Sequence, residues 1–160
     1  MIVVDANIVI YLLCGTPQTD LARQAYSADS DWIVPELWEP EVLNGLMGMR
    51  RGGLLDLEEA IRVWHKAAEL FFGHVRKCDP PSVLRTAEQA ELTAYDAYYV
   101  TLARTLGVML VTEDRKIQET CPDVARSLKA FLGLEEGPPG VREKPTAYRT
   151  RRTRRKRSTR

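Results

Sequence analysis

Hydrophobic residues form two short runs, and an acidic residue follows each run. Residues 2–4 are three β-branched residues followed at once by Asp5, and residues 108–111 are four apolar residues that lead into Thr112 and Asp114. Short runs that are apolar throughout are typical of strands buried on both faces of a parallel sheet. We therefore predict two central strands that bring these acids to the carboxyl edge of the sheet, where open α/β sheets bind ligands.

Between these strands, apolar residues recur at helical spacing, with capping residues before them and glycine or proline after them. The pattern predicts helices over residues 7–13, 19–28, 40–51, 57–71, 83–90 and 94–106, and a short helical piece over 116–119. It predicts further strands over residues 32–34 and 74–78, the latter a short or edge strand, and leaves residues 124–132 open between strand and helix. Strands that alternate with helices indicate an α/β fold, an α/β/α sandwich with a central, mainly parallel sheet.

The charge distribution divides the chain into two parts. Residues 141–160 hold ten Lys or Arg and one acid, a formal charge of +9, whereas the other 140 residues hold 13 basic and 21 acidic side chains, a charge of −8. A cluster of glycine and proline at residues 137–140 separates the parts. We therefore predict one domain over residues 1–134 and a linker with a basic tail, disordered when alone, over residues 135–160.

Composition indicates a cytoplasmic protein without a membrane segment. No stretch approaches the roughly 20 consecutive apolar residues of a membrane helix. The apolar start of the chain has neither a basic segment before it nor a small-residue cleavage site after it, so a signal peptide is not expected. Three widely spaced cysteines without a C-x-x-C pair favour reduced thiols over disulfides or zinc.

Four acids are candidates for a common site. Asp5 and Asp114 follow the predicted central strands, and Glu41 and Asp96 lie near predicted helix starts, where the helix dipole favours an anion. Each alone has an ordinary explanation as a helix cap, a helix-start acid or one exposed acid among several, and Glu36 or Glu39 could take the place of Glu41. Together, however, the four would meet at one edge of the sheet and repel each other unless a cation held them.

Hard divalent cations suit such a site. Mg²⁺ and Mn²⁺ prefer carboxylate oxygens and keep several waters, and at a phosphodiester they activate water, stabilise the leaving oxygen and neutralise phosphate charge. Histidine is not required, and we expect His65 on a helix surface and His74 in a loop. The aromatic residues Trp38, Trp64, Tyr98 and Tyr99 are expected in the core or in a dimer interface.

Four stretches of the chain resemble PIN-domain proteins, and specifically the VapC-type toxins of prokaryotic toxin–antitoxin pairs. These stretches are residues 3–7, 35–44, 92–97 and 110–116, and the resemblance covers about residues 1–132. It implies that Asp5, Glu41, Asp96 and Asp114 bind Mg²⁺ or Mn²⁺, with Asn7, Asn44 and Thr112 in support. It also implies cleavage of single-stranded or structured RNA by metal-activated water, homodimerisation, and inhibition by an antitoxin protein.

Basic residues supply candidate RNA contacts, because each phosphate that is neutralised releases counterions. Arg50 and Arg51 lie on the predicted helix that carries Glu41. The tail contributes Arg151, Arg152, Arg154 and Arg155, although charge runs are often only solvated.

Other classes of function fit the sequence less well. A catalytically inert RNA-binding or scaffold protein of the same fold is the main alternative, and the presence of all four acids argues against it. A phosphoacceptor domain needs an acidic pair or a D-x-D motif after the first strand, and residues 5–7 supply neither. Glycine-rich nucleotide-binding motifs are absent from the sequence.

Overall fold

A computed structural model describes residues 1–134, so the predictions for residues 135–160 lie outside the described residues. One five-stranded sheet with the order β3-β2-β1-β4-β5 forms the centre of the fold, and every strand pair in it is parallel. The strands are β1 (Ile2–Val4), β2 (Trp32–Pro35), β3 (Val75–Arg76), β4 (Leu110–Val111) and β5 (Ala125–Arg126). The predicted α/β sandwich with a central parallel sheet is confirmed.

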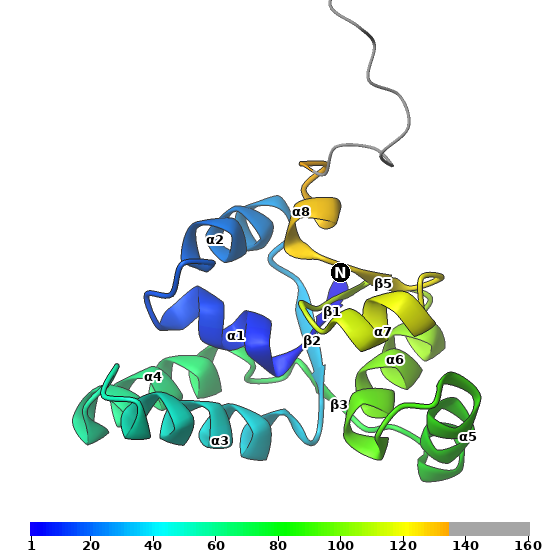
Figure 1. Cartoon of the computed structure of the whole chain (residues 1–160), viewed down its shortest axis with the longest axis horizontal. Coiled ribbons are helices and arrows are strands. Elements are labelled where there is room, and N and C mark those ends of the chain that lie inside the picture. Colours follow the sequence, from blue (N-terminus) through cyan, green and yellow to red (C-terminus); the bar gives the residue numbers. More distant parts are fainter. Residues whose placement is uncertain (135–160) are drawn as a thin grey trace, which may run out of the picture.

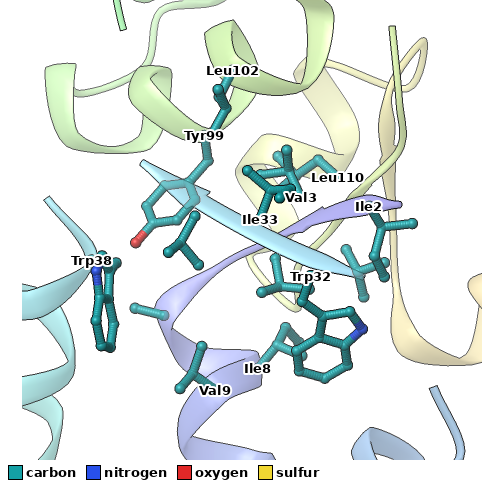
Figure 2. Close-up of a cluster of buried hydrophobic side chains, with 14 of the residues drawn as sticks. Ile2, Val3, Ile8, Val9, Trp32, Ile33, Trp38, Tyr99, Leu102 and Leu110 are labelled. Carbon is teal, nitrogen blue, oxygen red and sulfur yellow. The ribbon is translucent and has the colours of Figure 1, made fainter. Parts of the chain in front are cut away.

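The strand β1 lies in the middle of the sheet and is buried along its whole length. Val3 pairs with Ile33 of β2 on one side and with Leu110 of β4 on the other. Figure 2 shows these side chains in one cluster with Ile2, Leu102 and Trp32. A run that is apolar on both faces fits this position because helices cover the sheet on both sides.

Helices form two layers around the sheet (Figure 1). One side carries α1 (Ala6–Leu13), α2 (Thr19–Ala28), α3 (Trp38–Arg51) and α4 (Leu57–Leu70), and the other carries α5 (Pro80–Ala90), α6 (Ala94–Leu106) and α7 (Arg115–Thr120). The short α8 (Leu128–Phe131) packs against α2 and β5. At Gly45, α3 approaches α1 so closely that an added Cβ would lie 2.2 Å from Ile10 Cδ1.

Local sequence signals explain where the helices begin and end. Asp56 and Glu59 form a reciprocal capping box at the start of α4, and Asp79 caps α5 just before its initial prolines. Thr93 caps α6 by accepting from the backbone N–H of Asp96 at 3.2 Å. Gly107 ends α6 with a positive φ of 65°, a conformation that glycine adopts without strain.

Several boundaries differ from the prediction; for example, α5 begins at Pro80 instead of Val83. Helix α3 begins at Trp38 instead of Pro40, because a proline in the first turn loses no helical hydrogen bond. Strand β4 covers residues 110–111 only, although Met109 still accepts a hydrogen bond from the N–H of Val3 at 2.8 Å. Residues 124–132 contain both a strand, β5, and a helix, α8, so the two alternatives left open by the sequence each apply to part of the segment.

The three cysteines are free thiols, as predicted. In the part of the chain that the structure describes, no helix has the length and apolar character needed to cross a membrane.

Candidate active site

The four candidate acids lie at the topological switch point of the sheet, where the strand order reverses. From β1 the chain proceeds to β2 and β3 on one side and then crosses to β4 and β5 on the other, so β1 and β4 flank the switch point. Ligands bind outside the carboxyl ends of the strands at such a point. Asp5 directly follows β1 and Asp114 lies just beyond β4. Glu41 and Asp96 lie in the first turns of α3 and α6.

Asp5 does not use its side chain to cap α1, which begins directly after it. Its Oδ2 atom instead accepts hydrogen bonds from the Thr112 hydroxyl at 2.6 Å and from Asn7 Nδ2 at 3.0 Å. The Oδ1 atom of Asn7 is buried and has no hydrogen-bond partner among the described residues. A buried amide oxygen without a partner is costly in a folded protein, and it is also a ligand type that hard cations accept.

Thr112 joins the ends of β1 and β4. Its side chain is fully buried, and its hydroxyl donates to Asp5 while accepting from the N–H of Asp114 at 3.0 Å. Gln118 on α7 donates from Nε2 to the Thr112 carbonyl at 2.7 Å. Thr112 therefore contacts Asp5 and Asp114 directly, whereas no sequence signal pointed to Gln118.

Asp114 has the helix-capping role that Asp5 lacks. Its Oδ1 atom accepts from the backbone N–H of Ile117 at 3.0 Å and so caps α7. Its Oδ2 atom makes no hydrogen bond within residues 1–134, so one oxygen remains open to a ligand.

Glu41 is the acid of its segment that reaches the site. Its Oε2 atom accepts a hydrogen bond from the Tyr99 hydroxyl, which comes from α6 on the other side of the sheet. Glu36 instead accepts from the N–H of Cys78 at 3.0 Å, and Glu39 is exposed. The alternatives of Glu36 and Glu39 are therefore not supported by the structure.

The sequence placed Tyr99 in the core or an interface, and its ring is in the core, with 1% exposure. Its polar contact with Glu41 was not predicted. A signal for it exists in the sequence, because Tyr99 lies three residues after Asp96 and so on the same face of α6. Asp96 itself is half-buried and accepts from the Thr93 hydroxyl at 2.7 Å through Oδ2.

The pKa values show that these acids share one electrostatic environment. Burial raises the pKa of Asp5 to about 6, against the lowering effect of the Thr112 hydrogen bond, and the charge of Asp114 adds to the rise. Burial raises the pKa of Glu41 to about 7, the Tyr99 hydrogen bond opposes this, and the charges of Asp5 and Asp96 increase it. The structure therefore brings all four acids within electrostatic reach of at least one other.

Two further residues border the site and were missed by the sequence analysis. Burial, Glu113 and Asp5 together raise the pKa of Tyr11, which places its hydroxyl near these carboxylates. Glu113 accepts from the backbone N–H of Leu128 at 2.8 Å and so ties the loop after β4 to the start of α8.

In the described part of the chain, the four acids have no basic side chain to compensate their charge. Within the described residues, none of them forms an ion pair with Lys, Arg, His or the N-terminus. Among the same residues, no three acidic, histidine or cysteine side chains stand close enough to form a metal cage by themselves. Mg²⁺ does not need such a cage, because it keeps several waters and binds through one or two carboxylates. The donor set, with the unpartnered oxygen of Asn7, fits a hydrated hard cation.

The other predicted site residues on α3 are exposed. Asn44 is exposed and makes no hydrogen bond within residues 1–134. Arg50 and Arg51 are exposed at the far end of α3, and Arg50 lies about 13 Å along the helix axis from Glu41. The structure does not bring the two arginines to the acids, whereas Asn44 lies one turn after Glu41 on α3.

The remaining predictions concern histidines, aromatic residues and the tail. His65 is exposed on α4, and His74 precedes β3 in a turn, as expected. Trp38 is buried and stacks on the half-buried Trp64 with ring centroids 5.4 Å apart, in agreement with the prediction that these residues lie in the core or in an interface. The tail arginines, Arg151, Arg152, Arg154 and Arg155, lie outside the described residues.

Comparisons with known proteins point to one family. The PIN domain family matches residues 2–121. Ribonuclease VapC9 of Mycobacterium tuberculosis is 34% identical over 129 residues, which covers 76% of this chain and 95% of the relative. Ribonuclease VapC3 of Pyrobaculum aerophilum is 33% identical over 125 residues, with the same coverage.

Solved structures share the fold. PAE2754 from Pyrobaculum aerophilum superimposes with a TM-score of 0.65 at 26% identity, over 82% of this chain and 87% of that one. A chain of FitAB bound to a DNA fragment superimposes with a TM-score of 0.62 at 16% identity, over 80% and 95% of the two chains.

Proposed function

Because the chain belongs to the PIN-domain family, we propose that it is a metal-dependent endoribonuclease that cleaves single-stranded or structured RNA. Two relatives that are named ribonucleases, at 34% and 33% identity, support RNA as the substrate class. The observation that carries the proposal is a group of four acids at the switch point of the sheet. Each lies within electrostatic reach of at least one other, and none has a basic partner among the described residues.

Asp5, Glu41, Asp96 and Asp114 would hold Mg²⁺ or Mn²⁺ in this proposal. When bound, the cation supplies an activated water for in-line attack on a phosphodiester and neutralises the developing charge on the phosphate. The hydrogen bonds to Asp114 and Glu41 each engage one carboxylate oxygen, so the second oxygen of each is available for a ligand.

The surrounding residues keep the acids in place before substrate binds. Thr112 and Asn7 fix the orientation of Asp5 by donating to the same oxygen atom. Gln118 holds the backbone at Thr112 and thereby the path of the chain toward Asp114. Such preorganisation matters because a ligand group displaced by about 1 Å loses much of its effect on the reaction.

The family resemblance extends the proposal to partners. We place the protein as the toxin of a toxin–antitoxin pair, acting in the cytoplasm as a homodimer and inhibited by a cognate antitoxin. Growth arrest on expression of the chain, relieved by co-expression of a small neighbouring reading frame, would support this part. Growth that continues while the purified protein cleaves RNA would indicate a housekeeping nuclease instead.

The test of the proposed reaction is cleavage of labelled single-stranded RNA in Mg²⁺, in Mn²⁺ and in EDTA. Wild type is compared with Asp5→Asn and with Asp123→Asn, a matched change at an ion-paired acid outside the site. Metal-dependent cleavage that Asp5→Asn abolishes and Asp123→Asn retains would support the nuclease. Tight RNA binding without cleavage in either metal would favour the inert RNA-binding protein, and a chain ending at Gly140 would show whether the tail contributes to that binding.

A further inference from the structure

We propose that Tyr99 is a positioning residue that holds Glu41 for the divalent cation. The Tyr99 hydroxyl donates to Oε2 of Glu41 and leaves Oε1 for a ligand. This inference rests on the proposed function, because it concerns the same site.

The ring of Tyr99 is fixed by the core. Its exposure is 1%, and α6 packs against β1, β2 and β4. Figure 2 shows the ring beside Val3 and Ile33, with its hydroxyl oxygen directed toward the side of Trp38, the first residue of α3. The hydroxyl therefore reaches Glu41 across the carboxyl edge of the sheet. Because the Tyr99 ring is packed in the core, this side chain has little freedom to move.

A neutral donor suits this task better than a basic one. Lys or Arg beside Glu41 would compensate the carboxylate charge and compete with a cation, whereas a phenol orients the carboxylate and leaves its charge available. Burial and the charges of Asp5 and Glu41 raise the pKa of the Tyr99 hydroxyl, so it remains protonated and continues to donate.

Helix α6 then has two functions at the site. It supplies Asp96 directly, and one turn later it supplies the group that orients an acid of α3. The two layers of the sandwich are thus linked at the site by a single hydrogen bond between side chains 58 residues apart in sequence.

The variant that tests this is Tyr99→Phe, which removes the hydroxyl and keeps the ring. Its control is Tyr98→Phe, the neighbouring residue of α6, whose hydroxyl makes no hydrogen bond within residues 1–134. Mn²⁺ binding to the full chain is measured by calorimetry without RNA. We expect the Mn²⁺ dissociation constant to rise about 10-fold for Tyr99→Phe, the effect typical of losing a group that orients a metal ligand, and less than about 2-fold for Tyr98→Phe.

Two measurements separate positioning from a general loss of structure. In EDTA, the unfolding temperature of Tyr99→Phe should stay close to that of wild type while its Mn²⁺ affinity falls. In a Glu41→Gln background, Tyr99→Phe should cause no further loss of Mn²⁺ affinity, because a residue that acts through Glu41 has nothing left to position. A further loss of similar size in that background would overturn the proposal.

A second variant covers the case in which Tyr99→Phe does not fold. Glu41→Asp keeps the charge and withdraws the carboxylate by one methylene from the hydroxyl, so the Mn²⁺ affinity should fall at least as far. Suppose that Glu41→Asp or folded Tyr99→Phe binds Mn²⁺ as tightly as wild type while Asp5→Asn loses Mn²⁺ binding. That result would overturn this inference and leave the proposed function standing. A wild-type protein that neither binds Mn²⁺ nor cleaves RNA would overturn the proposed function, and this inference with it.

Discussion

Acidic residues at the two edges of the sheet differ in whether they have a basic partner. At the amino edge, Asp29 pairs with the N-terminal ammonium at 2.6 Å and Asp123 pairs with Arg104 at 2.9 Å. Asp31, just before β2, lies 3.6 Å from His74, just before β3. At the carboxyl edge, Asp5 and the three acids around it have no such partner within the described residues.

The pKa values follow this division. At the amino edge, the Arg104 hydrogen bond lowers the pKa of Asp123, and the N-terminal ammonium lowers that of Asp29 against the opposing effect of burial. At the carboxyl edge, burial and neighbouring acids raise the pKa values of Asp5 and Glu41. The acids at the amino edge thus stabilise the fold, whereas Asp5 and Glu41 at the carboxyl edge are retained at a cost in stability, which indicates a function.

Asp5→Asn should have the largest effect on activity. The amide keeps the shape of the side chain and removes the charge, so RNA cleavage should fall by more than about 100-fold, beyond what the loss of a merely supporting group causes. Cleavage rates in Mg²⁺ and Mn²⁺ check this. Retention of more than a tenth of wild-type activity would contradict the assignment of Asp5 as a ligand.

Asp114 differs from Asp5 in that it both caps a helix and faces the site. Asp114→Ala should lose activity and about 1 kcal/mol of unfolding free energy, because α7 loses its cap. Asp114→Asn should lose activity with little change in stability, since Asn caps helices about as well as Asp. Urea unfolding in EDTA measures the difference, and equal stabilities of the two variants would show that the cap does not matter.

Thr112→Val tests the link between the two strand ends. The change removes one of the two donors to Asp5 and leaves the N–H of Asp114 without its acceptor, so we expect a loss of about 1 to 3 kcal/mol in stability and about 10- to 100-fold in cleavage. Thr101→Val is the control, because it removes a buried hydroxyl that bonds Thr86 away from the site. That variant should lose stability and keep its activity. Equal activity losses in both would refute a specific role for Thr112.

Arg104→Met should have the smallest effect. It breaks an ion pair in which the Asp123 side chain is 54% exposed, so the loss of stability at neutral pH should be below about 1 kcal/mol. Because the pKa of Asp123 is lowered in the folded state, this contribution is present above its unfolded value of about 3.9 and disappears as the pH falls through the folded value. Unfolding of both proteins near pH 7 and at a series of pH values below about 3.9 checks this, and a difference that does not shrink as the pH falls would contradict the pairing.

Much of the fold could be predicted from the sequence, because its signals are local. Apolar runs of the right length gave β1 and β4, and capping residues such as Asp56 and Thr93 gave helix starts. The segment after Val124 could not be decided, because a two-residue strand and a four-residue helix are too short to show a period.

The site was predictable in part. Asp5 and Asp114 follow strands, α3 follows β2, and α6 leads into β4, so in a parallel sheet the topology places all four acids at the carboxyl edge. Which nearby acid reaches the site depends on side-chain packing between distant segments, and only the structure distinguishes Glu41 from Glu36. The contact of Gln118 is likewise tertiary and has no sequence signal. The spacing of Tyr99 from Asp96 places both on one face of α6, but it does not identify Glu41 as the partner of Tyr99.

The most direct test of the contrast between the two edges is the unfolding free energy of wild type and Asp5→Asn, each measured in EDTA and in saturating Mn²⁺. The account predicts that Asp5→Asn is the more stable protein in EDTA, because it removes an uncompensated charge. It predicts the reverse order in Mn²⁺, since a cation at about 100 times its dissociation constant adds about 2.7 kcal/mol to wild type alone. A wild-type protein that Mn²⁺ does not stabilise, or stabilises no more than Asp5→Asn, would contradict it.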